Sequence, residues 1–251
     1  GTSALTANTT AINNIAIGSG AGTAITTGGY NVAVGTNALK TITTTTANVA
    51  IGERALEDAT GAAEQNTAVG AHALRENTTA SNNAAFGYFA LGANTTGTGN
   101  VAVGHGAADA NTTGSQNTGL GVGALGANTT ADYNTAVGAD ALGTNTTGAT
   151  NDAFGYYALQ ANTTGSTNVA VGSRALMANT TADANTAVGR DALKANTTGA
   201  NNVAVGALAL DANTTGTNNT AVGHEALSAN TSSSYNTAVG KSALEVNTAA
   251  N

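Results

Sequence analysis

Residues 134–148 read NTAVGADALGTNTTG, and nearly all of the chain consists of copies of this stretch. Aligned on the glycine of its first five residues, Gly138, the sequence contains fourteen copies, from Gly18 to Gly240. Twelve of the thirteen intervals between these glycines span 17 positions, and the one from Gly52 to Gly70 spans 18. Self-similarity at a fixed, short period predicts a solenoid in which each copy forms one coil.

The repeat runs through all 251 residues without a break, so we predict one β-solenoid domain over residues 1–251. Gly1 lies one full period before Gly18, and the residues that follow it are in register with the repeat. We therefore expect a segment of a longer chain. Charged residues make up only 8% of the sequence, as in many disordered chains. The strict register of Leu and Val argues against disorder, which gives no reason to keep them at fixed positions.

The charge and the apolar pattern exclude two classes of partner. The net charge is −7, and the seven Lys and Arg residues are spread over the whole length, so no basic patch is available for a phosphate backbone. No apolar run approaches the roughly 20 residues that a membrane-spanning helix needs. We predict no nucleic-acid partner and no membrane insertion by this segment.

The residues before each repeat glycine alternate as in a strand. Asn stands four before the glycine in all fourteen copies, Ala stands two before it in all but one, and the residue directly before it is always apolar. Side chains in a strand point alternately to opposite faces, so Asn, Ala and Gly share one face and Val or Thr shares the other with Val. We expect the Val side chains to point into the coil. The predicted structural Asn ladder includes Asn100, Asn117, Asn134, Asn151, Asn168, Asn185, Asn202, Asn219 and Asn236.

The residues after the glycine predict a second strand and a turn. Ala stands three after it in all copies, Leu stands four after it in twelve, and the next position varies in charge. An apolar residue beside a freely varying one indicates a strand that buries Leu. Asn-Thr-Thr-Gly then supplies turn chemistry, because Asn and Gly tolerate positive φ. No segment has the spacing of a helix.

Such coils bury little. The free energy gained by burying one Leu and one or two Val per coil is well below the conformational entropy cost of ordering the whole coil. Hydrogen bonds between the coils reduce this difference but do not remove it. A second buried surface is required, and the small side chains of the Asn-Ala-Gly face would let backbones approach closely. We infer an obligate homo-oligomer, with three chains around one axis as the favoured arrangement.

The strings Asn100-Val101-Ala102-Val103-Gly104 and Asn14-Ile15-Ala16-Ile17-Gly18 resemble the head repeats of trimeric autotransporter adhesins. The longer form, NTAVGxxALxANTTG, is similar to repeats of bacteriophage tail fibres. The likeness covers the whole chain. It implies a left-handed parallel β-roll, three chains in a trimer, an extracellular, cell-surface or virion location, and attachment as the function. The repeat of the adhesin heads is shorter than the one in this chain, so the cross-section of the coil differs.

Two aromatic pairs are the candidate contacts for a receptor or glycan. Tyr88 and Phe89 follow Gly87, and Tyr156 and Tyr157 follow Gly155, four coils later. These positions vary among the copies, and exposed aromatic rings stack on sugars. The alternative is that they cover the edge of a neighbouring chain, while the preceding Phe86 and Phe154 fill the coil.

No residue set predicts catalysis, a cofactor or a metal. The three histidines lie in distant coils without ligand spacing, the acidic residues are scattered, and the Gly-x-Gly-x-x-Gly at residues 121–126 lacks the strand-to-helix context of a dinucleotide site. We predict a protein that is not an enzyme and uses no cofactor.

The favoured function is therefore a structural and adhesive fibre segment that presents a receptor-binding surface. An ice- or crystal-surface binder is the alternative, because Thr recurs at regular spacing. A carbohydrate-active β-solenoid enzyme is the third, disfavoured because no coil departs from the repeat to build a cleft.

Overall fold

The computed structural model describes residues 1–246 of the chain. The chain divides into two compact units, the first spanning Gly1–Thr130 and the second beginning at Ala131. All of the strands in the described part are three residues long, and no helix occurs there, so nothing helical could cross a bilayer within residues 1–246.

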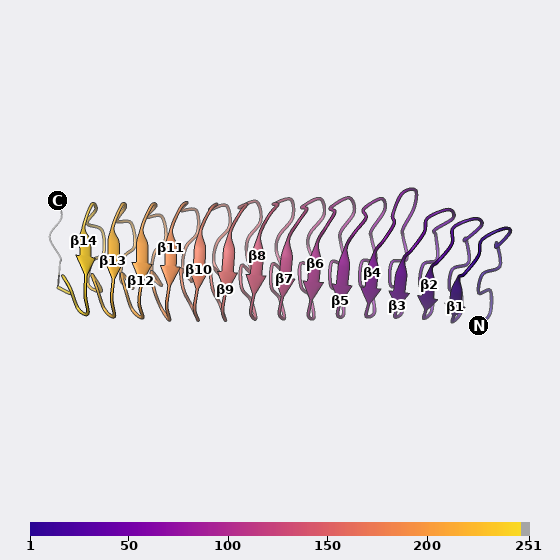
Figure 1. Ribbon diagram of the computed structural model, residues 1–251, viewed down its shortest axis with the longest axis horizontal. Coiled ribbons are helices and arrows are strands. Elements are labelled where there is room, and N and C mark those ends of the chain that lie inside the picture. The colour runs from indigo at the N-terminus through magenta and orange to yellow at the C-terminus, as the bar shows by residue number, and fades with distance from the viewer. Residues whose placement is uncertain (247–251) are drawn as a thin grey trace. The chain divides into compact units, whose positions relative to one another are not determined.

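The first unit is a parallel sheet of seven strands that lie side by side in chain order (Figure 1). Each strand ends directly before a repeat glycine, so every coil contributes one. The strands are β1 (Ile15–Ile17), β2 (Val32–Val34), β3 (Val49–Ile51), β4 (Thr67–Val69), β5 (Ala84–Phe86), β6 (Val101–Val103) and β7 (Thr118–Leu120).

The second unit repeats this arrangement with another seven parallel strands in chain order (Figure 1). These strands are β8 (Thr135–Val137), β9 (Asp152–Phe154), β10 (Val169–Val171), β11 (Thr186–Val188), β12 (Val203–Val205), β13 (Thr220–Val222) and β14 (Thr237–Val239).

The strand register equals the sequence period. Val169 lies opposite Thr186 and Ala170 opposite Ala187, each pair one period apart. Val49 lies opposite Thr67, so the longer interval between their two coils leaves the strand register intact and its extra residue lies outside the strands. The prediction of an all-β parallel solenoid with one coil per copy of the repeat is confirmed.

The orientation of the strand is the reverse of the one predicted. The Asn and Ala side chains are buried inside the coil, with Asn151 and Ala153 both fully inaccessible. The Val, Ile and Phe side chains on the other face point outward, and Val171 retains 38% of its accessible surface. The expectation that Val fills the coil and that the Asn-Ala-Gly face is external was wrong.

The width of the coil explains this reversal. At Gly119, the one copy that lacks the inner Ala, an added Cβ would lie 3.7 Å from Leu125 Cδ1 and 3.2 Å from the Ala124 carbonyl oxygen. One methyl group therefore fills the space between the strand and the Ala-Leu segment across the coil. A branched side chain would overpack it, so Val is excluded from the inside.

The Ala-Leu segment is a turn rather than the predicted second strand. Leu142 is fully buried, as expected, but its φ is +49°, and Asp140 two residues earlier also has a positive φ of +52°. Non-glycine residues rarely adopt this left-handed conformation, which is unfavourable by about 1–2 kcal/mol. It directs the N–H of Leu142 to the carbonyl oxygen of Ala158 in the next coil, at 3.0 Å. Hydrogen bonds between coils and the burial of Leu offset the strain.

Asparagine ladders run through the interior of each unit. The backbone N–H of Asn151 donates to Oδ1 of Asn134 (2.9 Å), and its Nδ2 donates to the same oxygen (3.2 Å) and to the Gly165 carbonyl (2.9 Å). A second column comes from the turn, where Nδ2 of Asn162 donates to Oδ1 of Asn145 at 2.8 Å. Buried amide side chains thus satisfy backbone groups that no strand partner reaches.

Candidate functional site

Both aromatic pairs lie just after a repeat glycine, where the chain leaves the strand. Tyr88 and Tyr156 are half-exposed, at 49% and 50% of their accessible surface. Phe89 and Tyr157 have positive φ values of +57° and +58°, which the turn imposes on every residue in this column. The two pairs therefore have the same backbone conformation, and they differ in their second ring (Phe89 or Tyr157) and in their neighbours.

The first pair belongs to a ladder of rings. Phe89 stacks on His72 of the preceding coil with ring centroids 4.7 Å apart, and Arg75 lies over the Phe89 ring at 5.5 Å. Tyr88 stacks on His105 of the following coil at 5.4 Å. The faces of these rings are used by protein groups, and Nδ1 of His72 is buried without a hydrogen-bond partner in the described part of the chain. This arrangement is suited to packing between coils.

The second pair has fewer ring contacts with other residues. Tyr156 and Tyr157 stack on each other with centroids 3.9 Å apart and planes 27° apart. Within residues 1–246 neither ring has a second aromatic or cation–π contact. The neighbouring Tyr157 hydroxyl raises the pKa of Tyr156 by favouring its protonated form. A ring face remains available to a ligand.

Phe86 and Phe154 do not fill the coil, contrary to the prediction. Both retain 41% of their accessible surface. They end β5 and β9 on the outward sheet face, in the same column as Val69 and Val103, which flank Phe86. The coil interior has no room for them, because Ala occupies it.

A cluster of charges lies next to the second pair. Arg174 Nη2 donates to Asp191 Oδ2 at 2.8 Å, and Arg190 Nη1 donates to the same oxygen at 2.6 Å. Asp191 is buried, while the two arginine side chains keep 38% and 57% of their accessible surface. Sequence reasoning missed this cluster. The signal was present, because Arg174 stands one period after Tyr157 and one period before Asp191.

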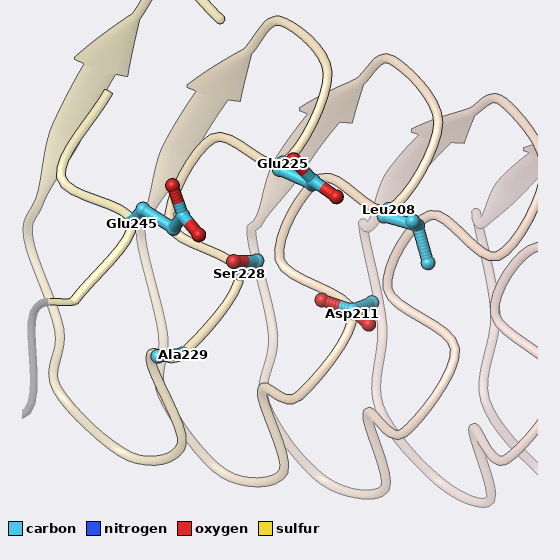
Figure 2. Close-up of a pocket in the computed structure, with 6 residues that line it drawn as sticks. All are labelled: Leu208, Asp211, Glu225, Ser228, Ala229 and Glu245. Atoms are coloured by element: carbon cyan, nitrogen blue, oxygen red, sulfur yellow. The ribbon is translucent and has the colours of Figure 1, made fainter. Parts of the chain in front are cut away.

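A shallow hollow of about 240 Å³ is lined by three carboxylates on successive coils of the second unit (Figure 2). These are Asp211, Glu225 and Glu245, with Leu208, Ser228 and Ala229 completing the wall. Burial raises the pKa of Asp211, whose Oδ1 is inaccessible and has no hydrogen-bond partner among the described residues. Glu225 is 3.2 Å from Nδ1 of His224. The hollow offers carboxylates but no nucleophile activated by a base.

Threonine hydroxyls in the turns are largely engaged by the backbone. Oγ1 of Thr146 donates to the Thr163 carbonyl oxygen at 3.0 Å, and Oγ1 of Thr163 donates to that of Thr180 at the same distance. The next residue of each turn, such as Thr147, is exposed. One column of free hydroxyls remains, beside Gly in a turn rather than on the flat sheet.

The outward sheet face carries a nearly uncharged column of side chains along each unit. In β1 to β7 its side chains are apolar or Thr at every position, and in the described strands β8 to β14 Asp152 is the one charge on it. Ile51, Val103, Val171 and Val205 each retain between 37% and 40% of their accessible surface. Water-exposed apolar columns of this regularity are typical of interaction surfaces.

Within residues 1–246 no three His, Cys, Asp or Glu side chains come together as metal ligands. The chain matches no family model, and neither a curated protein nor a solved structure matches it.

Proposed function

We propose that this chain is a structural and adhesive fibre segment. Three copies assemble side by side as left-handed β-rolls, outside the cell, on the cell surface or on a virion, and present a receptor-binding surface. The observation that carries the proposal is the uncharged outward face of β1 to β7. The interior of this chain contains few large side chains, so covering this apolar face with other copies would add the apolar burial that the interior lacks.

The copies pack through the Val face, not through the Asn-Ala-Gly face that the sequence suggested. Seven strands about 4.8 Å apart and three residues wide present roughly 300 Å² of flat surface per unit. That is the size of the largest apolar patches on monomeric proteins, and both units carry such a face. Covering it with two further copies supplies the apolar burial that a thin Ala-Leu interior cannot.

Sedimentation equilibrium of the refolded chain, residues 1–251, tests the assembly. We expect a trimer, and a stable folded monomer would contradict the proposal. The paired substitution Val103→Glu and Val205→Glu places a charge on the sheet face of each unit, where both side chains are 40% or less exposed, and should yield monomers.

A matched control introduces the same two charges in the same two coils, but away from the sheet face. Thr113→Glu and Thr215→Glu lie in exposed turns of coils in the same two units. This control should remain trimeric. If both double variants stay trimeric and folded, another surface holds the copies together.

The fibre proposal is favoured over an ice-binding function by the engaged Thr146-type hydroxyls. A flat array of free Thr would be needed to order water, whereas the flat face here carries Val at alternate positions. If a solution of the folded oligomer showed thermal hysteresis, the ice-binding function would be favoured instead.

A further inference from the structure

The Tyr156–Tyr157 pair and the arginines beside it form one continuous surface on three successive coils. Arg174 follows Tyr157 by one period, and its backbone N–H donates to the Tyr156 carbonyl oxygen at 2.9 Å. The Tyr156 side chain is 50% exposed and that of Arg174 is 38% exposed. An aromatic face and a guanidinium are thus presented side by side.

The charge balance of this surface favours an anion. Arg174 and Arg190 converge on one oxygen of Asp191, so two cations share a single buried anion. Lys194 lies in the same turn as Asp191, and its charge is offset by Asp211 one period later, so the excess positive charge is that of the two arginines. Three of the seven basic residues of the chain thus lie on two neighbouring coils. The guanidinium donors that do not contact Asp191 remain for a ligand, since each guanidinium carries five N–H groups.

One acidic group opposes an anion from the other side. Asp140 stands in the coil before Tyr157, where its charge acts on Tyr156. An anionic ligand that stacks on Tyr156 is therefore directed away from Asp140 and toward Arg174. The charge on this surface therefore changes from negative at Asp140 to positive at Arg174 along the direction in which the coils stack.

We propose that this surface binds a polysaccharide that carries uronic acids. A pyranose ring stacks its C–H face on Tyr156, and the carboxylate of the same or the next sugar accepts hydrogen bonds from Arg174, with Arg190 adding attraction. Aromatic rings recognise the apolar faces of sugars, and the planar guanidinium fork matches a carboxylate. This inference rests on the adhesive function proposed above and names the chemical class of its ligand.

The pair at Tyr88 and Phe89 serves as an internal contrast. Its rings already contact His72, His105 and Arg75, so we expect it to stabilise the coils rather than to bind sugar. The two pairs were equivalent candidates in the sequence. The residues one period before and after each pair distinguish them.

The test uses isothermal titration of the full chain with an oligogalacturonate and with its methyl ester, which has the same sugars without the charge. We expect the acid to bind and the ester to bind at least about tenfold more weakly, the value of one charge-assisted hydrogen bond. Arg174→Gln should reduce affinity for the acid by about tenfold and leave that for the ester unchanged. Arg190 still pairs with Asp191 in this variant, so the fold is retained.

Arg54→Gln is the matched control. Arg54 occupies the same column of the repeat and donates to a buried carboxylate, Glu57, at 2.5 Å, but no Tyr follows the repeat glycine of its preceding coil. This variant should bind the acid like the wild type. Tyr156→Ala should weaken both probes, while Tyr88→Ala should weaken neither.

Equal binding of acid and ester, with no effect of Arg174→Gln, would overturn the acidic class but leave Tyr156 as a sugar contact. Binding of neither probe at millimolar concentration would overturn the polysaccharide inference altogether. Sedimentation of the same sample reports on the fibre assembly independently, so the two proposals fail separately.

Discussion

Gly104 shows how closely the coils are packed, and Gly104→Ala tests that packing. Its φ is +136°, a region that only glycine readily occupies. A Cβ at this position would lie 2.5 Å from the carbonyl oxygen of Gly121 in the next coil, 2.7 Å from its carbonyl carbon and 3.1 Å from the Val122 nitrogen. All three atoms are backbone, so no side chain can rotate away.

The magnitude follows from two contributions. The backbone strain is about 1–3 kcal/mol for a non-glycine residue in a sparsely populated region. Separating the coils to relieve the overlap also weakens the hydrogen bond from Gly121 N–H to the Val103 carbonyl, now 2.8 Å, at about 1 kcal/mol per bond. We expect Gly104→Ala to lower the free energy of unfolding by about 3 kcal/mol.

Urea unfolding followed by circular dichroism, at one fixed protein concentration, measures this effect. At a slope of about 1–3 kcal/mol/M the midpoint should fall by about 1 M or more. Gly99→Asn is the control in the same coil. Gly99 has a φ of +67° and only the Gln116 Cγ within reach of an added Cβ, at 3.6 Å, and Asn82 adopts nearly the same φ in another copy. The control should shift stability by less than about 1 kcal/mol. Equal midpoints for the two variants would refute the inferred backbone contact.

Two further predictions concern buried polar groups. Asn151→Ala removes the acceptor of the Asn168 N–H, which is left buried without a partner, and one of two donors to the Gly165 carbonyl, which keeps Asn162 Nδ2; the free energy of unfolding should fall by about 2 kcal/mol, measured by urea unfolding, and a loss below about 1 kcal/mol would contradict the ladder. Burial raises the pKa of Asp211 above its usual 3.8, so the folded chain binds this proton more tightly than the unfolded chain and the ionised carboxylate is destabilising at neutral pH. Asp211→Asn should therefore raise the melting temperature at pH 7, and the difference from wild type should close as the pH falls through the raised pKa to 3.8; a difference independent of pH would contradict the assignment.

Much of the coil could be predicted from the repeat because its columns record backbone requirements. The invariant glycine marks a close approach between coils, as at Gly104, and the invariant Asn marks an interior ladder, as at Asn151. The buried Leu in most copies of the repeat, such as Leu142, was also predictable, since a fixed apolar residue beside a variable one indicates the edge of a core. The Gly, Asn and Leu positions could be predicted because the packing that requires each of them recurs in almost every coil.

The candidate site was less predictable, because its character depends on neighbours one period away. Phe86-Gly87-Tyr88-Phe89 and Phe154-Gly155-Tyr156-Tyr157 look equivalent along the chain. Only stacking of the coils places His72 on one pair and Arg174 beside the other. Comparing each residue with those one period before and after it would have revealed these contacts.

The sequence by itself determined the period, the parallel stacking and the assignment of residues to two faces of the strand. Only the tertiary structure decided which face is inside. Alternation fixes that Asn and Ala share a side but not its direction, and apolar character alone favours Val as the inner residue. The Ala-Leu segment across the coil leaves space for one methyl group, so Ala is buried and the Val column remains outside for a partner.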